Sequence, residues 1–443
     1  MSDLPMPKGW AQASLGDLAD FTNGKAFKKE EWLETGKPII RIQNLNNSSA
    51  KFNYADDSHE EKYLVRNGDL LVSWSASLGV YYWISGDAWL NQHIFRVDNL
   101  RGCDKNYLKY ALEISIEDFY AKAHGMGMVH ITKGNFESHL VPLPPIAEQT
   151  RIAAKLDELL AQLNILKARI DSIPALLKRF RQSVLAAATD GTLTESWRQG
   201  SKTAFEWRSA IFSELLREFR GGASKKPSDL MEGVPVIRSS AVRSMNVDFS
   251  DIRYFDIVAE LDHRNFVQEG DLLFTRLSGS PEFVGVCALV KTLPKNPTQF
   301  PDRLFCARLK DIKNGPYLEI FFSSQTYLDY IKNNLKSSAG HQRITTETVK
   351  SSFVLLPTPA EQTEIVRRTE QLFGYANQLE AKVNAARKRI DQMTQSILAK
   401  AFRGELVTQD PSDEPASVIL ERIKAQRATA PKTKRGRQPA RSG

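Results

Sequence analysis

The chain has 443 residues, a formal net charge of +8 and an apolar fraction of 42%. This length fits about three structural units, and the apolar fraction supplies real cores, which excludes a disordered protein. Without an apolar run of about eighteen residues, and with an N-terminus that lacks the basic and apolar regions of a secretory signal, the sequence predicts no membrane span and a cytoplasmic protein.

The first predicted domain covers residues 1–142. Short β-rich runs, such as PIIRIQ (38–43), DLLVSW (69–74) and HIFRV (93–97), alternate with a helical stretch over 104–120. The sequence therefore predicts a mixed α+β domain.

A long helical segment follows over residues 143–199. Its apolar residues recur at alternating steps of four and three, which is typical of a coiled-coil seam: Ile152, Leu156, Leu159, Leu163, Leu166, Ile170, Ile173, Leu177, Phe180 and Val184. A straight helix from 152 to 184 spans roughly 48 Å, the length of a spacer. Pro174 predicts a kink or a brief break near residues 171–174.

Residues 200–355 repeat the first domain. Trp10 aligns with Trp207 and PIIR (38–41) with PVIR (235–238), both at a shift of 197, and GDLL (68–71) aligns with GDLL (270–273) at a shift of 202. Near the end, residues 127–132 align with 340–345 at a shift of 213. Insertions in steps between matching anchors are typical of surface loops on a shared scaffold, so we expect a second α+β domain.

The second helical segment, residues 356–408, repeats the first without a gap at a shift of 213, with identity at about a third of positions. The same columns hold Ile365, Thr369, Leu372, Ala376, Leu379, Val383, Ala386, Ile390, Met393 and Ile397. Such a stripe also fits a face buried against a globular core. The equal length and matched register of the two copies favour an antiparallel pair with a pseudo-two-fold axis.

The C-terminal segment, residues 409–443, carries much of the charge. From Glu421 to the end there are eight basic residues and one acidic residue, a net charge of +7, so the rest of the chain is nearly neutral. We interpret the end as a disordered basic arm, and its contact with phosphates is left open.

Motifs for chemistry are missing from the sequence. There is no GxxxxGK[ST] phosphate loop, no HExxH and no GxSxG, and the three cysteines form no CxxC pair. The cluster Gly125-Met126-Gly127 lacks a third glycine, and the histidines show no metal-ligand spacing. We therefore predict no catalytic residue and no metal site.

The arrangement of two blocks, each followed by an AEQT-led helix, resembles the specificity subunit of type I restriction-modification systems. The residues that carry the resemblance are LPPIAEQTRIAAKLDELLAQLN (143–164), LLKRFRQSVLAAATDGTLT (176–194), LLPTPAEQTEIVRR (355–368) and SILAKAFRGELVTQDPSDEPASVILERI (396–423). It implies two α/β target recognition domains separated by two long antiparallel helices that form a coiled-coil spacer.

The resemblance also implies partners. These are double-stranded DNA with a bipartite site, two methyltransferase subunits, and restriction subunits with motor and nuclease activity. This chain would then be a non-catalytic subunit without a cofactor, with S-adenosylmethionine on the methyltransferase and ATP and Mg on the restriction subunit. It further implies partner contacts for the residues shared by the two helical segments, Glu148, Gln149, Glu361 and Gln362.

The duplication divides the candidate DNA-binding residues into those that both blocks share and those that differ. Residues that both blocks share, such as Arg41 and Arg238, Asp69 and Asp271, or Thr132 and Thr345, fit a role in the fold or in phosphate contact, whereas residues that differ fit base reading. The candidates in the first block are Arg41, Gln43, Asn44, Trp74, Gln92, His93 and His130; those in the second are Arg238, Ser240, Arg243, Arg276, Arg303, His341, Gln342 and Arg343.

Two other functions stay open from the sequence. One is a coiled-coil interaction scaffold that binds no DNA, and the other is a fused enzyme whose catalytic motif escapes recognition. A DNA-binding assay with and without a methyltransferase separates the first, and a methyl-transfer assay on the isolated chain separates the second.

Overall fold

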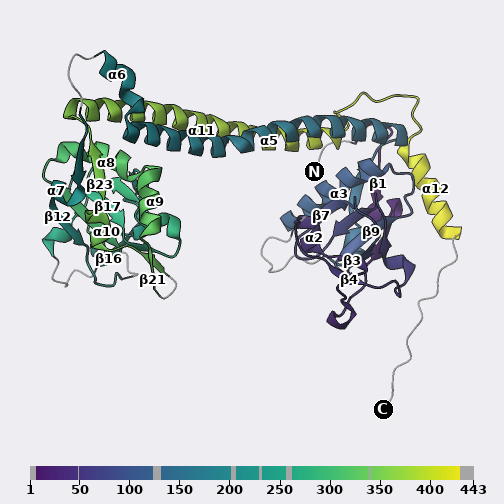
Figure 1. Ribbon diagram of the computed structural model, residues 1–443. Coiled ribbons are helices and arrows are strands. Elements are labelled where there is room, and N and C mark those ends of the chain that lie inside the picture. Colours follow the sequence, from purple (N-terminus) through teal and green to yellow (C-terminus); the bar gives the residue numbers. More distant parts are fainter. Residues whose placement is uncertain are drawn as a thin grey trace. The chain divides into compact units, whose positions relative to one another are not determined.

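The computed structural model describes residues 6–47, 49–122, 131–200, 206–228, 232–255, 262–338 and 341–429. The chain divides into two compact units: unit 1 contains residues 1–169 and 387–443, and unit 2 contains residues 170–386. Each unit holds one α+β domain and parts of both long helices (Figure 1). This confirms the predicted fold class, while the predicted division into five segments stays a prediction.

Unit 1 is built on two four-stranded sheets. The first has the spatial order β2 (Asp20–Asn23), β9 (Ile94–Asp98), β6 (Leu70–Ser73) and β7 (Gly79–Tyr82). The second has the order β4 (Asn53–Ala55), β3 (Lys37–Ile40), β8 (Ala88–Leu90) and β5 (Leu64–Val65). The helices are α1 (Leu15–Leu18), α2 (Ile42–Asn46), α3 (Lys105–Lys122) and α4 (Lys133–Glu137). The predicted strands are confirmed, except that PIIRIQ leaves the sheet at Ile40 and continues into α2.

Unit 2 repeats the first of these sheets. Its order is β12 (Leu216–Gly221), β20 (Leu304–Leu309), β17 (Leu272–Thr275) and β19 (Cys287–Leu289), which matches β2-β9-β6-β7 strand for strand. The other pairings are β13 (Val234–Ile237) with β16 (Ile252–Phe255), β14 (Val242–Arg243) with β15 (Asn246–Val247), and the ribbon β18 (Leu277–Ser278), β22 (His341–Arg343) and β21 (Lys336–Ser338). The predicted duplication is therefore confirmed in the strand order.

The helices that follow the sheet strands β9 and β20 differ between the two units. Where unit 1 has the single helix α3, unit 2 has α8 (Gly315–Phe322) and α9 (Gln325–Asn333), with α7 (Phe212–Leu215) and α10 (Thr346–Lys350) matching α1 and α4. The side chain of Ser324 accepts a hydrogen bond from the amide of Tyr327 and caps α9. This cap starts a new helix directly after α8 ends, so residues 315–333 form two helices.

Equivalent turns and caps confirm that shared residues serve the fold. Gly68 and Gly270 have φ values of +87° and +85°, which a side chain would strain. Asp69 and Asp271 accept the amides of Arg66 and Gln268, each at 2.8 Å. Thr132 and Thr345 cap α4 and α10 in the same way.

Each α+β domain passes into a long helix through a two-stranded sheet. In unit 1, β1 (Ala11–Ser14) pairs with β10 (Leu140–Leu143), which leads to α5 (Ile146–Asp190). In unit 2, β11 (Arg208–Ile211) pairs with β23 (Phe353–Leu356), which leads to α11 (Pro359–Ala401). Gly191 and Gly404 follow the helices with φ values of +88° and +74°, as expected of helix ends.

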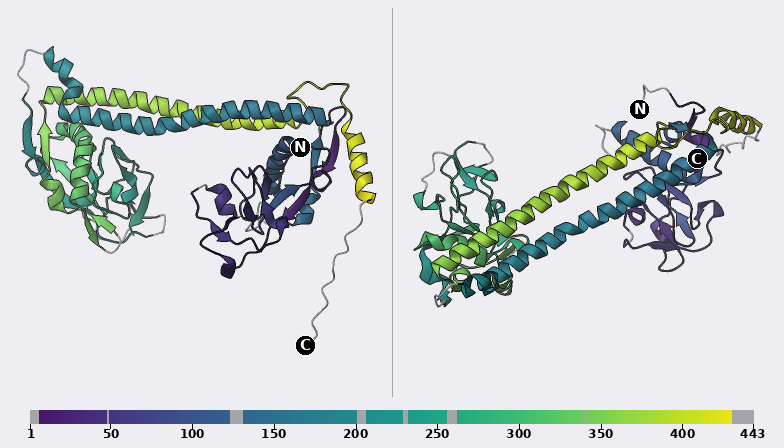
Figure 2. Two further views of the ribbon diagram at one scale, coloured as in Figure 1. Left: turned by 45° about the vertical axis from the view of Figure 1, so that its right-hand side comes forward. Right: turned by 90° about the horizontal axis from the view of Figure 1, so that it is seen from above.

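The two long helices lie side by side within each unit (Figure 2). In unit 1, Lys167 forms an ion pair with Asp391 at 2.8 Å, and in unit 2, Arg181 forms one with Glu380 at 2.7 Å. α5 continues through Pro174, so the predicted break is wrong, because the loss of one hydrogen bond is local and the turns on both sides hold. The smaller expectation, a bend at this proline, stays a prediction.

Each long helix has two rows, or columns, of apolar residues in the predicted seam, and only one of these columns is buried or half-buried along its length. Along α5 the buried or half-buried column is Leu156, Leu163, Ile170, Leu177 and Val184, and along α11 it is Thr369, Ala376, Val383, Ile390 and Ile397; Ile152 and Ile365 are also buried. In the other column Leu159 and Leu372 are half-buried. Four residues of that column are exposed: Leu166 (47%), Phe180 (39%), Leu379 (45%) and Met393 (52%). The prediction is therefore wrong at these four residues, because a contact through one column per helix leaves the other column exposed to solvent.

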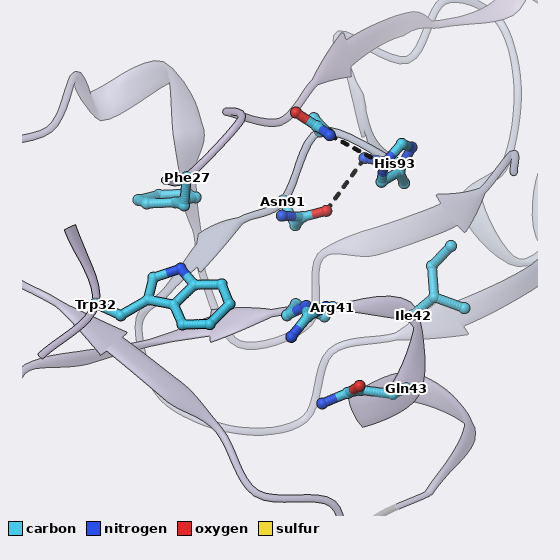
Figure 3. Close-up of a pocket in the computed structure, with 8 residues that line it drawn as sticks. Phe27, Trp32, Arg41, Ile42, Gln43, Asn91 and His93 are labelled. Atoms are coloured by element: carbon cyan, nitrogen blue, oxygen red, sulfur yellow. Dashed lines mark hydrogen bonds between the residues drawn. The ribbon is translucent and has the colours of Figure 1, made fainter. Parts of the chain in front are cut away.

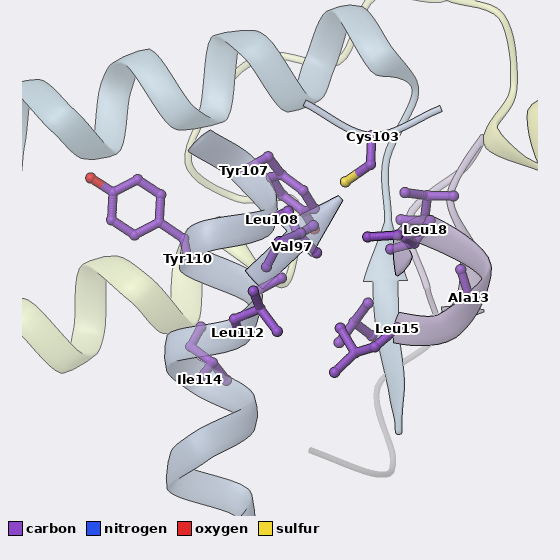
Figure 4. Close-up of a cluster of buried hydrophobic side chains, with 14 of the residues drawn as sticks. Ala13, Leu15, Leu18, Val97, Cys103, Tyr107, Leu108, Tyr110, Leu112 and Ile114 are labelled. Carbon is purple, nitrogen blue, oxygen red and sulfur yellow. The ribbon is translucent and has the colours of Figure 1, made fainter. Parts of the chain in front are cut away.

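The core of unit 1 joins the sheet, α3 and the long helices. Leu15 and Leu18 of α1 gather with Val97, Tyr107 and Leu108 (Figure 4), in a cluster that also contains apolar side chains of α5 and α11. Burial of each large apolar side chain contributes about 1.5–3 kcal/mol. The cluster thus fixes the α+β domain on the helix pair.

The C-terminal helix α12 (Ala416–Thr429) packs on the domain of unit 1. Arg427 forms an ion pair with Asp17 at 2.8 Å, and Ile419 and Ile423 lie against the backbone of Gly102. Among the described residues, no helix has the length and apolar character required to cross a membrane.

Candidate nucleic-acid interface

A tryptophan and a buried glutamate anchor each domain to the start of a long helix. Trp10 Nε1 donates to Glu148 Oε2 at 3.1 Å, and Trp207 Nε1 donates to Glu361 Oε2 at 3.0 Å. Glu148 is 1% exposed and Glu361 is fully buried. The aligned tryptophans therefore have the same role in both units.

The two anchors differ in charge. Glu361 is paired with the guanidinium of Arg198 and accepts a bond from Thr194 at 2.7 Å. The structure gives Glu148 no direct cation among the described residues, and burial raises its pKa above the ordinary value. The anchor of unit 1 therefore holds a buried carboxyl group without the neutralising guanidinium that unit 2 has.

The glutamines beside these glutamates bind the backbone. Gln149 Nε2 donates to Pro144 O at 2.9 Å, and Gln362 Nε2 donates to Pro357 O at 3.0 Å. The four side chains Glu148, Gln149, Glu361 and Gln362 are buried and bonded within their own unit, so they join the domain to the helix. Their predicted contact with a partner subunit stays a prediction.

An open pocket of about 340 Å³ lies on the α+β domain of unit 1. It brings together four residues predicted to bind DNA, Arg41, Gln43, Gln92 and His93, with Phe27, Trp32, Ile42 and Asn91 (Figure 3). The mixture of amide, guanidinium and aromatic groups suits hydrogen bonds to base edges together with ring stacking. These four predicted residues thus form one site.

Arg41 and its counterpart Arg238 are held differently. The Arg41 guanidinium lies over the Trp32 ring, 5.5 Å from its centroid, and has no ion pair among the described residues. Arg238 lies 3.4 Å from Asp251, to which Ser240 also donates a hydrogen bond. The positive charge is therefore open in unit 1 and neutralised in unit 2.

Two candidates of unit 1 serve the fold instead of an open surface. Asn44 is buried, accepts from Arg41 N at 3.1 Å, and donates to two backbone carbonyls. Trp74 is half-buried and donates from Nε1 to Asn23 Oδ1 at 3.1 Å. Because the Asn44 amide is used by the loop, its predicted base contact is corrected; His130 lies outside the described residues.

In unit 2 the candidates gather around the β18-β22-β21 ribbon. Gln342 pairs with Ser278 and Ser337 across the ribbon, Arg343 pairs with Leu277 and Lys336, and His341 and Arg343 are exposed. Arg276 precedes β18 and its guanidinium donates to Asp302 O at 3.1 Å. Arg303 is exposed beside it.

Arg243 has different contacts: its guanidinium lies 4.5 Å from the centroid of the Phe283 ring and donates one hydrogen bond to Val242 O.

The sequence did not predict Phe27, Trp32 and Asn91 as residues of the pocket. Phe27 and Trp32 follow no periodic pattern, and the only signal was two aromatic residues in a polar loop.

Comparisons with known proteins agree with this architecture. The family model described as the type I restriction modification DNA specificity domain matches residues 7–175. The type I restriction enzyme EcoKI specificity subunit of Escherichia coli (strain K12) is 38% identical over 97% of this chain and 98% of that protein. The EcoBI specificity subunit of Escherichia coli is 32% identical over 96% of this chain and 94% of that protein.

Solved structures show the same fold. A chain from the structure titled as the basis of complex assembly and conformational transition of the type I R-M system matches with a TM-score of 0.64 and 16% identity, over 91% of this chain and 100% of that chain. The HsdS subunit from Thermoanaerobacter tengcongensis matches with a TM-score of 0.52 and 17% identity, over 91% and 99%. With relatives above 30% identity along nearly the whole length, this chain belongs to the family of type I restriction enzyme specificity subunits.

Proposed function

We propose that this chain selects the DNA site of a type I restriction-modification complex in the cytoplasm, with each α+β domain reading one half of a bipartite double-stranded site. The observation that carries the proposal is the repeated sheet, β2-β9-β6-β7 and β12-β20-β17-β19, with different side chains at the ends of its central strands. A shared scaffold with different reading residues is what two unlike half-sites require. Two tethered domains also add their discrimination, since one bidentate base contact contributes only about 1–3 kcal/mol.

The chemistry in this proposal belongs to partner subunits. Methylation of adenine uses S-adenosylmethionine on the methyltransferase, and restriction uses ATP and Mg on the motor and nuclease subunit. This chain recognises the DNA site and serves as the scaffold. The family relationship and the absence of nucleotide-binding and nucleophile motifs from the sequence support this division.

The exposed apolar columns of the long helices support two copies of the methyltransferase. In unit 1 the exposed pair is Leu166 and Met393, and in unit 2 it is Leu379 and Phe180, related by the shift of 213. Exposed apolar patches on soluble proteins commonly mark binding surfaces. One equivalent patch in each unit fits one methyltransferase subunit per unit.

A methyl-transfer assay tests the division of labour. The purified chain alone should transfer no methyl group to DNA, and the chain with its methyltransferase should methylate a single bipartite motif. Methyl transfer by the isolated chain would contradict the proposal.

Mass measurement of the intact complex tests the two patches. Leu166→Glu with Met393→Glu should leave the fold intact and reduce the complex from two methyltransferase subunits to one. The control is Asn164→Glu, which adds one of these two charges at an exposed position on another side of α5. Two bound subunits in the double variant would show that this patch is not the docking surface.

A further inference from the structure

Both domains contain one backbone corner, built where the strand β6 or β17 ends. In unit 1, Trp74 N donates to His93 O at 3.3 Å, and Ile131 N donates to Trp74 O at 3.4 Å. In unit 2, Arg276 N donates to Arg303 O at 2.8 Å, and Ile344 N donates to Arg276 O at 3.0 Å. The same two hydrogen bonds make Trp74 equivalent to Arg276, and His93 equivalent to Arg303.

A tight turn carries the second residue of each corner. The turn spans residues 91–94 in unit 1 and 301–304 in unit 2, and it is closed by Ile94 N to Asn91 O at 3.1 Å and Leu304 N to Pro301 O at 3.0 Å. Gly24 and Gly222 lie so close to these turns that an added Cβ atom would meet Asn91 O at 2.2 Å in unit 1. In unit 2 it would meet Phe300 O, directly before the turn, at 2.1 Å and Pro301 O at 2.6 Å. The neighbouring backbone therefore holds the turn in one position.

The first residue of each corner supports the turn. Trp74 stacks on Phe95 with ring centroids 5.5 Å apart, and the Arg276 guanidinium lies 5.5 Å from the centroid of Phe305. Phe95 and Phe305 occupy equivalent places on β9 and β20, directly after the strands begin. Arg276 also donates to Asp302 O in the turn. Trp74 and Arg276 therefore both support the turn and are positioning residues.

The turn residues themselves differ in chemistry and in freedom. Arg303 is exposed, and no hydrogen bond or ion pair holds its guanidinium among the described residues. Some other arginines of this domain are neutralised by a carboxylate, as Arg308 is by Asp271 at 3.1 Å and Arg220 by Asp262 at 2.9 Å. In unit 1, His93 is half-buried in the pocket with its Nε2 3.0 Å from Gln92 Nε2.

We propose that the turn residue sets the base preference of each domain, and that Arg303 reads a guanine in the half-site of unit 2. A guanidinium offers two parallel donors that match O6 and N7 of guanine in the major groove, and an imidazole does not. Arg303 is free to make this pair, and the corner fixes its position. The inference rests on the proposed function and adds the residue and the base to it.

The test measures DNA affinity of the whole complex with its methyltransferase on a panel of sites. Each base pair of each half-site is changed in turn, at one fixed salt concentration. Arg303→Ala should lower discrimination at one G·C pair of one half-site by about 5- to 100-fold and leave the other positions unchanged. Arg303→His, which installs the residue of unit 1, should give the same loss at the same pair.

Arg217→Ala is the matched control, because Arg217 is an exposed arginine at the other end of the β12-β20 pair. It should leave discrimination unchanged at every position. Unchanged discrimination in both Arg303 variants would overturn the inference and leave the proposed function standing. A wild-type complex that binds all sites of the panel equally would instead overturn the proposed function.

Discussion

The anchors of the two units show the same geometry with different electrostatics. In both, a tryptophan donates to a buried glutamate at the start of a long helix, at 3.1 Å and 3.0 Å. In unit 2, Arg198 neutralises the glutamate, whereas in unit 1 burial raises the pKa of Glu148. The side-chain hydrogen bond that joins domain and helix is the same in both units, whereas the charges around it differ.

A second pair of equivalent positions repeats this lesson at the surface. In unit 2, Arg253 lies opposite Val236, and Asp251, two residues before Arg253, pairs with Arg238. In unit 1, Asn53 lies opposite Ile39, and the residue two positions before Asn53 is Lys51. A carboxylate in one unit thus corresponds to an ammonium group in the other. As a result, Arg238 of unit 2 has an ion pair, and Arg41 of unit 1 has none among the described residues.

Removal of the arginine from the anchor of unit 2 should have the largest effect. Arg198→Met leaves the Glu361 charge buried without a cation, which should lower the free energy of unfolding by about 3 kcal/mol, the lower end for breaking a buried pair because Arg198 is partly exposed. Denaturant unfolding measures the loss, and amide exchange should locate it at β11 and β23. Double replacement with Glu361→Gln should recover part of the stability; a single variant as stable as the wild type would contradict the account.

Substitution of the two turn glycines should give equal, intermediate effects. Gly24→Ala and Gly222→Ala each force a Cβ atom against a carbonyl oxygen at about the same distance, and overpacking of this kind costs about 2 kcal/mol. Thermal unfolding of each variant gives the comparison. Gly279→Ala, where no atom lies within 4 Å of the added Cβ, is the control, and a clear inequality between the first two would show that the turns are not equivalent.

Replacement of the unpaired glutamate should have the smallest effect. Because the folded unit binds the Glu148 proton more tightly than the unfolded chain, stability falls as pH rises from about 4.5 through the raised pKa. Glu148→Gln removes this titration and keeps the bond from Trp10, so at pH 7 the free energy of unfolding should change by no more than about 1 kcal/mol. Stability curves of both proteins from pH 4 to 8 measure it; a steeper loss in the variant would show that the charged carboxylate is stabilising.

The sequence predicted the duplication because Trp10 and Trp207, and the two AEQT segments, keep fixed spacings. It did not predict that these residues bond to each other, since burial brings together positions far apart in the chain. The equivalence of His93 and Arg303 was hidden by insertions between anchors, and only the backbone bonds of the corner reveal it. A heptad pattern likewise gives two columns and cannot say which of them the partner helix covers.

Exchange of one domain is the direct test of whether each domain reads its own half-site. Residues 206–355 are replaced by the equivalent block of a relative, with both long helices kept, and the methylated motif is determined by sequencing of the host DNA. We expect one half of the motif to change to that of the relative while the other half stays as it was. A change in both halves, or in neither, would contradict it.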